Sequence, residues 1–257
     1  MDRRASATDS TFIDTHAAMI NLIDGLTNRP NISLYVDLEG VNLSRHSTIS
    51  IMQMLVHPLN KIYLIDIHTL DRNAFYNPGR AGTTLKDILE SKQILKVFFD
   101  VRNDSDALFG LYGIRLAGIQ DIQLMEVASR KFLGSDTRKW LSGLKKCIEN
   151  DSSLPSSYRE TWRQIKESGR RLFVPESGGS FEIFNTRPLP DAIRLYYIQD
   201  VQFMPGLLEY YKSILSLAWT RRVEHEIEAR LASTQPEGFN SCGPGKTLAP
   251  IGWLCIK

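Results

Sequence analysis

Apolar and polar side chains alternate between Ile32 and Leu38, and this alternation constrains the fold more than any other feature. Successive side chains of a β-strand point to opposite faces. One face therefore carries three apolar residues, Leu34, Val36 and Leu38. The other face carries Tyr35, Asp37 and Glu39. The pattern predicts a strand with one face in the core and two carboxylates at its end.

Two further strands are predicted at residues 48–56 and 61–66, joined by a Pro-containing turn at 57–60. The three strands together form an antiparallel meander. Helical and strand patterns then alternate, at residues 84–91 (helix), 94–99 (strand), 104–112 (helix) and 119–122 (strand). Alternation of this kind after a meander predicts an α/β fold, in which helices flank a mixed sheet of antiparallel and parallel strands.

Helical patterns dominate the rest of the chain. They cover residues 12–26, 123–132, 137–149, 157–167, 190–217 and 219–232. Residues 171–188 contain two adjacent glycines and are expected to form an irregular insertion. Residues 233–257 are rich in Gly and Pro and are expected to be loop or disordered. The pattern predicts one folded domain over residues 1–232, followed by a tail at 233–257.

The composition is that of a folded globular protein. The chain has 257 residues, 42% of them hydrophobic, and a formal net charge of +2. These values argue against intrinsic disorder and against a coiled coil. Three scattered cysteines, without a C-x-x-C pair, favour neither a disulfide framework nor a zinc site. No signal peptide or membrane span is evident, so we expect an intracellular protein, in the nucleus or cytoplasm, with no membrane partner.

Asp37 and Glu39 form a D-x-E pair on one face of the predicted strand, about 6.5–7 Å apart along the chain. Two carboxylates so placed can share one or two hard cations. By itself the pair is weak evidence, because two solvated acids on a strand are common. The same holds for Asp104, which sits where an acid often caps a helix.

Tyr196 and Asp200 form a second pair, Y-x-x-x-D, within a predicted helix. Positions i and i+4 share one helix face, so a phenol would stand one turn from a carboxylate. Tyr196 could instead belong to a core aromatic pair with Tyr197. The order and context of the three acidic segments carry more information than any of them alone.

Together these segments resemble the DEDD superfamily of 3′–5′ exonucleases, in the branch with Tyr in the last motif. The matching segments are VDLEG (36–40), VRNDSDALFGLYGI (101–114) and RPLPDAIRLYYIQD (187–200). The resemblance extends from about residue 12 to 217. Within the superfamily the chain is most similar to RNase D-like domains of the exonuclease-domain-like, Egalitarian-type subgroup. It implies an RNase H-like fold and identifies residues 1–232 as an exonuclease domain.

The resemblance also implies roles for individual residues. The metal-binding carboxylates would be Asp37, Glu39, Asp104 and Asp200, with Tyr196 as the catalytic residue beside them. Asp106 competes with Asp104 for the third position. In related enzymes this acid stands about nine residues before the turn that ends its helix, and the distance from Asp104 to Gly113 is nine (113 − 104). The residues after D-x-E would contact nucleic acid, namely Gly40, Val41 and Asn42.

Four carboxylates without Cys or His favour two hard divalent cations, Mg²⁺ or Mn²⁺. The implied function is metal-dependent hydrolysis of phosphodiester bonds from the 3′ end of RNA or DNA, with single-stranded 3′ ends as the expected substrate. The alternative is a catalytically weak nucleic-acid-binding adaptor on the same fold, because the subgroup includes such proteins. The intact set of four acids and Tyr196 favours the enzyme.

Two other sequence features are not part of the resemblance to the exonucleases. The segment GPGKT at 243–247 is similar to part of a phosphate-binding loop, but the full pattern requires Gly at position 240, which is Asn240 here. Arg45 and His46 follow the D-x-E strand closely. Basic residues in such places more often form a solvated surface than phosphate contacts.

Overall fold

The computed structural model describes residues 10–131 and 135–254, and its centre is a six-stranded sheet. The strands are β1 (Ser10–Ile13), β2 (Ser33–Glu39), β3 (Ile51–His57), β4 (Lys61–Asp66), β5 (Leu95–Phe98) and β6 (Ile119–Asp121). Their order in the sheet is β1-β4-β3-β2-β5-β6. Strands β2, β3 and β4 are antiparallel, and β1, β5 and β6 each pair with a parallel neighbour. The predicted mixed sheet is therefore confirmed.

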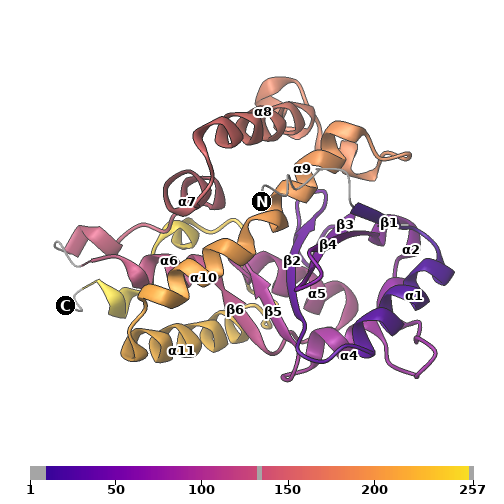
Figure 1. Ribbon diagram of the computed structural model, residues 1–257, viewed down its shortest axis with the longest axis horizontal. Coiled ribbons are helices and arrows are strands. Elements are labelled where there is room, and N and C mark those ends of the chain that lie inside the picture. The colour runs from indigo at the N-terminus through magenta and orange to yellow at the C-terminus, as the bar shows by residue number, and fades with distance from the viewer. Residues whose placement is uncertain (1–9, 132–134, 255–257) are drawn as a thin grey trace.

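Helices surround this sheet (Figure 1). They are α1 (His16–Thr27), α2 (Ile67–Leu70), α3 (Asn73–Tyr76), α4 (Leu85–Glu90), α5 (Arg102–Tyr112), α6 (Ile122–Ser129), α7 (Leu144–Asp151), α8 (Ser156–Phe173), α9 (Asp191–Gln202), α10 (Met204–Ile214) and α11 (Leu217–Ser233). Helix α9 contacts β2, β3 and β4, and α8 packs on α9. Helices α10 and α11 both pack on α6, and α11 also contacts β6, so these two helices cover the β6 side.

Strand β2 lies in the middle of the sheet and behaves as the alternation predicts. Leu34 and Val36 are fully buried and Leu38 is 3% exposed, while Asp37 and Glu39 are only partly buried. Strand β5 pairs with β2 only along Ser33–Tyr35. The last part of β2 therefore extends beyond β5, and its two carboxylates stand where β5 has ended and α5 begins.

Several helices differ from the sequence-based expectation. The segment predicted as a helix from residue 12 begins as strand β1, because helix α1 starts only after Thr15, whose side chain accepts a hydrogen bond from the Ala18 amide. The predicted helix at 190–217 is two helices that meet at Phe203. Pro205 lies in the first turn of α10 and disfavours continuation of the preceding helix.

Two other differences lie nearby. The predicted helix at 137–149 is divided into a 3₁₀ turn, Ser135–Arg138, and α7, which begins after Gly143. Helix α8 extends to Phe173, six residues past the predicted end at residue 167 (173 − 167), so it takes up the start of the predicted insertion. The rest of that insertion forms two 3₁₀ turns, Pro175–Ser177 and Phe181–Asn185.

The segment after Ser233, expected to be loop or disordered, has two 3₁₀ turns, Pro244–Thr247 and Ile251–Trp253. It lies against the domain, and the ring of Trp253 is only 5% exposed and packs edge-on against Trp219. Among the described residues, no helix is long and apolar enough to cross a membrane.

Candidate active site

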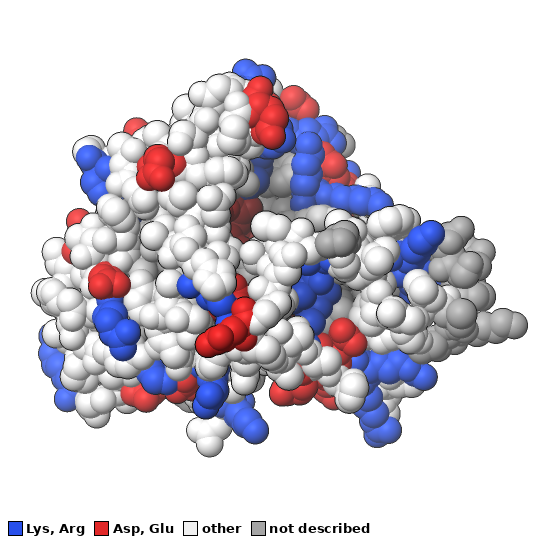
Figure 2. All heavy atoms as spheres, turned by 180° about the vertical axis from the view of Figure 1, so that it is seen from behind, with Lys and Arg blue, Asp and Glu red and all other residues white. Residues whose placement is uncertain are grey.

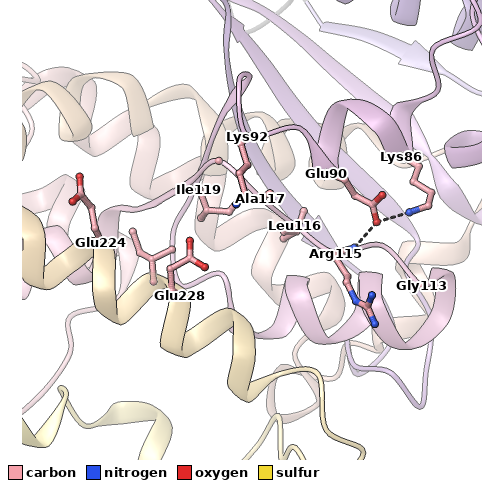
Figure 3. A pocket seen from close by; sticks show the side chains of 12 residues that line it. Lys86, Glu90, Lys92, Gly113, Arg115, Leu116, Ala117, Ile119, Glu224 and Glu228 are labelled. Atoms are coloured by element: carbon pink, nitrogen blue, oxygen red, sulfur yellow. Dashed lines mark hydrogen bonds and ion pairs between the residues drawn. The ribbon is translucent and has the colours of Figure 1, made fainter.

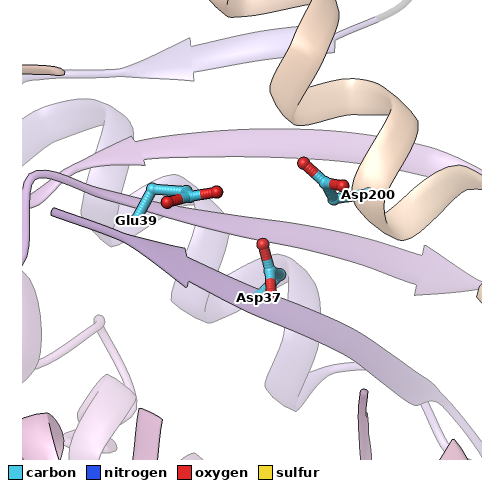
Figure 4. Close-up of side chains that lie close together, drawn as sticks. All are labelled: Asp37, Glu39 and Asp200. Atoms are coloured by element: carbon cyan, nitrogen blue, oxygen red, sulfur yellow. The ribbon is translucent and has the colours of Figure 1, made fainter. Parts of the chain in front are cut away.

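Strand β2 and helix α9 bring three of the predicted ligands together (Figure 4). Asp37 and Glu39 project from the same face of β2, and Asp200 reaches them from α9. One carboxylate oxygen of each residue can be chosen so that the three atoms lie within 4.8 Å of one another. Because all the donors are hard oxygens, the group could hold a hard divalent cation.

Asp104 lies in the first turn of α5 and is outside that group of three. It is 5% exposed, and its Oδ1 has no hydrogen-bond partner among the described residues. The charge of Asp104 nevertheless contributes to raising the pKa values of Asp37 and Glu39, which places it close to them. We call Asp37, Glu39, Asp104 and Asp200 the acid cluster.

Asp106, the competitor for the third position, has a different role. Its carboxylate accepts hydrogen bonds from the Arg45 amide at 2.9 Å and from Arg45 Nε at 2.6 Å. Both side chains are buried, at 1% and 7% exposed. Asp106 is therefore committed to holding the loop after β2, and Arg45 is not a free phosphate contact. The helix ends at Gly113 with a φ of 64°, as the nine-residue spacing requires.

The acid cluster has strongly perturbed proton affinities. Burial, together with the charges of Asp200 and Asp104, raises the pKa of Glu39 to about 8, against the opposing charge of Lys166. Burial also raises the pKa of Asp104 to about 8. The pKa values of Asp37 and Asp200 are raised too, again mainly by burial. Carboxylates so crowded repel one another, and a bound cation would relieve that repulsion.

Lys166 of α8 is a site residue that sequence reasoning missed. Its Nζ donates a hydrogen bond to Oδ1 of Asp200 and lies 3.1 Å from the ring centroid of Tyr196. The other oxygen of Asp200 is buried without a hydrogen-bond partner among the described residues. Nothing in the local sequence indicates this role, because Lys166 stands in a charged helix without a motif.

Tyr196 projects from α9 one turn before Asp200. Its ring packs edge-on against the ring of Phe173, with the ring centroids 5.1 Å apart. Burial raises its pKa above the ordinary value, and the negative charges of Asp200 and Glu39 add to this. Gly169 of α8 allows the close approach, because a Cβ there would lie 2.6 Å from the Cβ of Tyr196. The neutral phenol is therefore held beside the acid cluster.

The turn after β2 contains the three predicted nucleic-acid contacts. A Cβ on Gly40 would lie 2.0 Å from the carbonyl oxygen of Thr48, so only glycine fits there. The carbonyl of Val41 accepts a hydrogen bond from the Ser47 hydroxyl. Asn42 has a φ of 49°, in the left-handed region. These features define a tight turn, and its contact with nucleic acid stays a prediction.

Figure 2 shows the face opposite to that of Figure 1. This face is hollowed near its middle, with acidic side chains set back in the hollow and Lys and Arg side chains around it. A different hollow of about 670 Å³ lies between α4, β6 and α11 (Figure 3). None of the acid cluster lines it. Its charges are partly paired with one another, as in the Lys86–Glu90 ion pair.

The architecture and the acid cluster agree with one protein family. The family model described as 3′–5′ exonuclease matches residues 10–204. The chain belongs to this family. The match covers all six strands and ends at the first residue of α10, so it includes every predicted ligand.

Relatives of known name support the assignment. The mouse (Mus musculus) piRNA biogenesis protein EXD1 is 32% identical over 189 residues, which are 71% of this chain and 30% of the mouse protein. The chain thus spans under a third of that relative's length. The structure of Trypanosoma brucei RNase D in complex with RNA U12 matches 95% of this chain and 77% of its own, with a TM-score of 0.72 and 21% identity.

A third similar structure is Brucella melitensis NrnC with bound Mg²⁺, at a TM-score of 0.52 and 18% identity over 79% of this chain and 83% of its own. Matches at such low identity establish the fold. They confirm the RNase D-like architecture that the sequence motifs imply.

Proposed function

We propose that this chain is a metal-dependent 3′–5′ exonuclease that hydrolyses phosphodiester bonds from the 3′ end of RNA or DNA by a two-metal mechanism. The observation that carries the proposal is the acid cluster, in which three carboxylates can place oxygens within 4.8 Å of one another. Asp104 and Asp200 each have one buried oxygen without a hydrogen-bond partner among the described residues, and such oxygens are the ligands expected at a site that binds cations.

Asp37, Glu39, Asp104 and Asp200 would hold two Mg²⁺ or Mn²⁺ ions. When bound, such ions would activate a water molecule and stabilise the leaving 3′ oxygen. Lys166 would have to leave Asp200 Oδ1, or share that carboxylate, when a cation binds. The relatives named above, an RNase D in complex with RNA and an NrnC with bound Mg²⁺, support a nucleic-acid substrate and a hard metal.

Tyr196 would orient the attacking water. The raised pKa keeps its hydroxyl neutral, so it can donate and accept hydrogen bonds but is a poor base. Tyr196→Phe removes only the hydroxyl, and the loss of such a positioned group typically lowers kcat by ~10²–10⁴-fold. Tyr197→Phe is the matched control, because its buried hydroxyl lacks a hydrogen-bond partner among the described residues. Equal turnover of the two variants would contradict the role of Tyr196.

One observation favours a second candidate, the catalytically weak nucleic-acid-binding adaptor. Lys166 neutralises part of the acid cluster through its ion pair with Asp200. The mouse relative is also named for piRNA biogenesis and not for a nuclease activity. In an adaptor this ion pair would persist, and added metal would not displace it.

The deciding experiment uses 5′-labelled single-stranded RNA and DNA of one sequence, with the purified protein in Mg²⁺, Mn²⁺ or EDTA. We expect a descending ladder of products in metal, none in EDTA, and none from an Asp200→Asn control. Binding without a ladder in either metal would support the adaptor. Cleavage that survives thorough chelation would contradict the metal-dependent mechanism.

A further inference from the structure

The C-terminal segment, residues 234–254, returns to the acid cluster although it lies beyond the family match. The carbonyl of Thr247 accepts a hydrogen bond from the Leu141 amide at 2.9 Å. Trp253 packs edge-on against Trp219 of α11, with ring centroids 5.3 Å apart. These contacts anchor the chain that follows Lys246, and Lys246 itself lies against the start of α5.

Lys246 contacts two residues at the start of α5. Its Nζ donates a hydrogen bond to Oδ1 of Asn103, the residue before Asp104. Its carbonyl accepts a hydrogen bond from Arg102 Nη2 at 2.8 Å. Burial lowers the pKa of Lys246, whereas the nearby charges of Asp100 and Asp104 raise it. Lys246 is thus held beside the acid cluster by both its ammonium group and its backbone carbonyl.

The ammonium group of Lys246 differs from the neighbouring arginines, because it has no direct counter-ion in the part of the chain that the structure describes. Among the residues that the structure describes, no carboxylate oxygen lies within 4.0 Å of its Nζ. By contrast, Arg102 makes a two-pronged contact with Asp100, and Arg45 is paired with Asp106. Among the described residues, Lys246 is thus a cationic side chain without a direct ion pair, at the rim of a site whose other ionisable groups are mostly acids.

We propose that Lys246 binds a phosphate group of the nucleic-acid strand whose 3′ end enters the acid cluster, so that residues 234–254 form part of the substrate-binding surface. The inference rests on the proposed function and adds a contact to it. Lysine suits this role because its ammonium is a compact charge with three donors on a flexible stem. A nucleic-acid strand that approaches four carboxylates is repelled by them, and a cation at their edge lowers this electrostatic cost.

Binding of a 5′-fluorescent single-stranded RNA, followed by anisotropy at several salt concentrations, tests the proposal. Ca²⁺ takes the place of Mg²⁺ because it uses the same oxygen ligands. For one lost phosphate contact the slope of log K against log salt becomes shallower by about 0.7, which corresponds to about fourfold weaker binding at ~0.15 M salt. We expect both changes for Lys246→Met and Lys246→Gln, and recovery in Lys246→Arg.

Lys92→Met is the matched control, because Lys92 is exposed and lines the separate hollow near α4. It should leave the affinity and the salt slope unchanged. Thermal unfolding of each variant shows that the fold is retained. If the wild type binds RNA but both uncharged Lys246 variants match its affinity and slope, this proposal is overturned. If the wild type binds neither RNA nor DNA, the proposed function fails instead.

Discussion

Two groups of buried acids lie close together in this protein and differ in their partners. In the first, which we call the paired cluster, Asp100 and Asp121 meet Arg102 and Arg230. Arg230 Nη1 lies 2.6 Å from Asp121 and 3.4 Å from Asp100, and Arg102 holds Asp100 with two hydrogen bonds. In the second, the acid cluster, four carboxylates have one direct cationic partner among the described residues, Lys166.

Asp100 of the paired cluster and Asp104 of the acid cluster have pKa values shifted in opposite directions. Burial alone would raise the pKa of Asp100, yet the hydrogen bonds from Arg102 and the charge of Arg230 lower it below its ordinary value. Burial raises the pKa of Asp104, and no arginine opposes it. The difference shows that the fold can supply guanidinium partners to buried acids and does not do so at the acid cluster. Uncompensated acids of this kind are typical of functional sites.

The largest effect expected from this difference is on turnover. Asp104→Asn should lower metal-dependent cleavage by more than ~100-fold, because loss even of a group that only supports a metal ligand typically costs about 10- to 100-fold. Its stability in EDTA should not fall, because Asn keeps the size of Asp104 and cannot take on the charge that burial disfavours. Gel assays of single turnover and thermal unfolding measure the two effects.

Asp106→Asn is the control for that variant, two residues along the same helix. It leaves the acid cluster intact and should cleave, while losing stability because the buried Arg45 loses its carboxylate. The reverse outcome, an inactive Asp106→Asn and an active Asp104→Asn, would show that Asp106 is the ligand.

The paired cluster should respond to mutation through stability. Arg230→Met leaves Asp121, which is fully buried, without its guanidinium partner. Removing one partner of a buried ion pair typically lowers the free energy of unfolding by about 3–5 kcal/mol. Urea titration measures this change. Arg171→Met, in an exposed pair with Glu167, is the control and should change stability little. A small effect of Arg230→Met would mean that the contrast between the clusters is unimportant for folding.

The parts of the site that depend on local pattern could be predicted from the sequence. Alternation along β2 places Asp37 and Glu39 on one face, and helical spacing places Tyr196 one turn from Asp200. The nine-residue spacing to Gly113, where α5 ends, favours Asp104 over Asp106 as the ligand, and this assignment stays a prediction. The strands of the sheet could be predicted for the same reason, because apolar and polar side chains alternate along them.

The parts that depend on packing between distant segments could not be predicted. Lys166 reaches Asp200 only because Gly169 lets α8 approach α9 closely. Lys246 reaches Asn103 only because the chain turns back after α11. Neither contact has a local signature, so both residues read as ordinary surface lysines. The break between α9 and α10 was missed although Pro205 marks it, because the helical pattern continues on both sides.

The effect most specific to the comparison is the pH dependence of stability without metal. Glu39 and Asp104 have pKa values of about 8 in the folded state and ordinary values near 4 when unfolded. Between those pH values the folded state binds more protons, so stability is fully present at low pH and is lost as pH rises towards 8.

The loss should reach at most about 1.4 kcal/mol per pH unit for each such group. Asp100 of the paired cluster does not contribute in this window, because its lowered pKa removes stability only as pH falls into the acid range. Urea unfolding in EDTA from pH 5 to 8 should therefore show a decline that is shallower in Asp104→Asn. Saturating Mn²⁺ should abolish it, because the cation binds the ionised carboxylates and replaces their protons. Equal slopes with and without Mn²⁺ would mean that no cation binds the acid cluster, and the contrast between the two clusters would then carry no functional meaning.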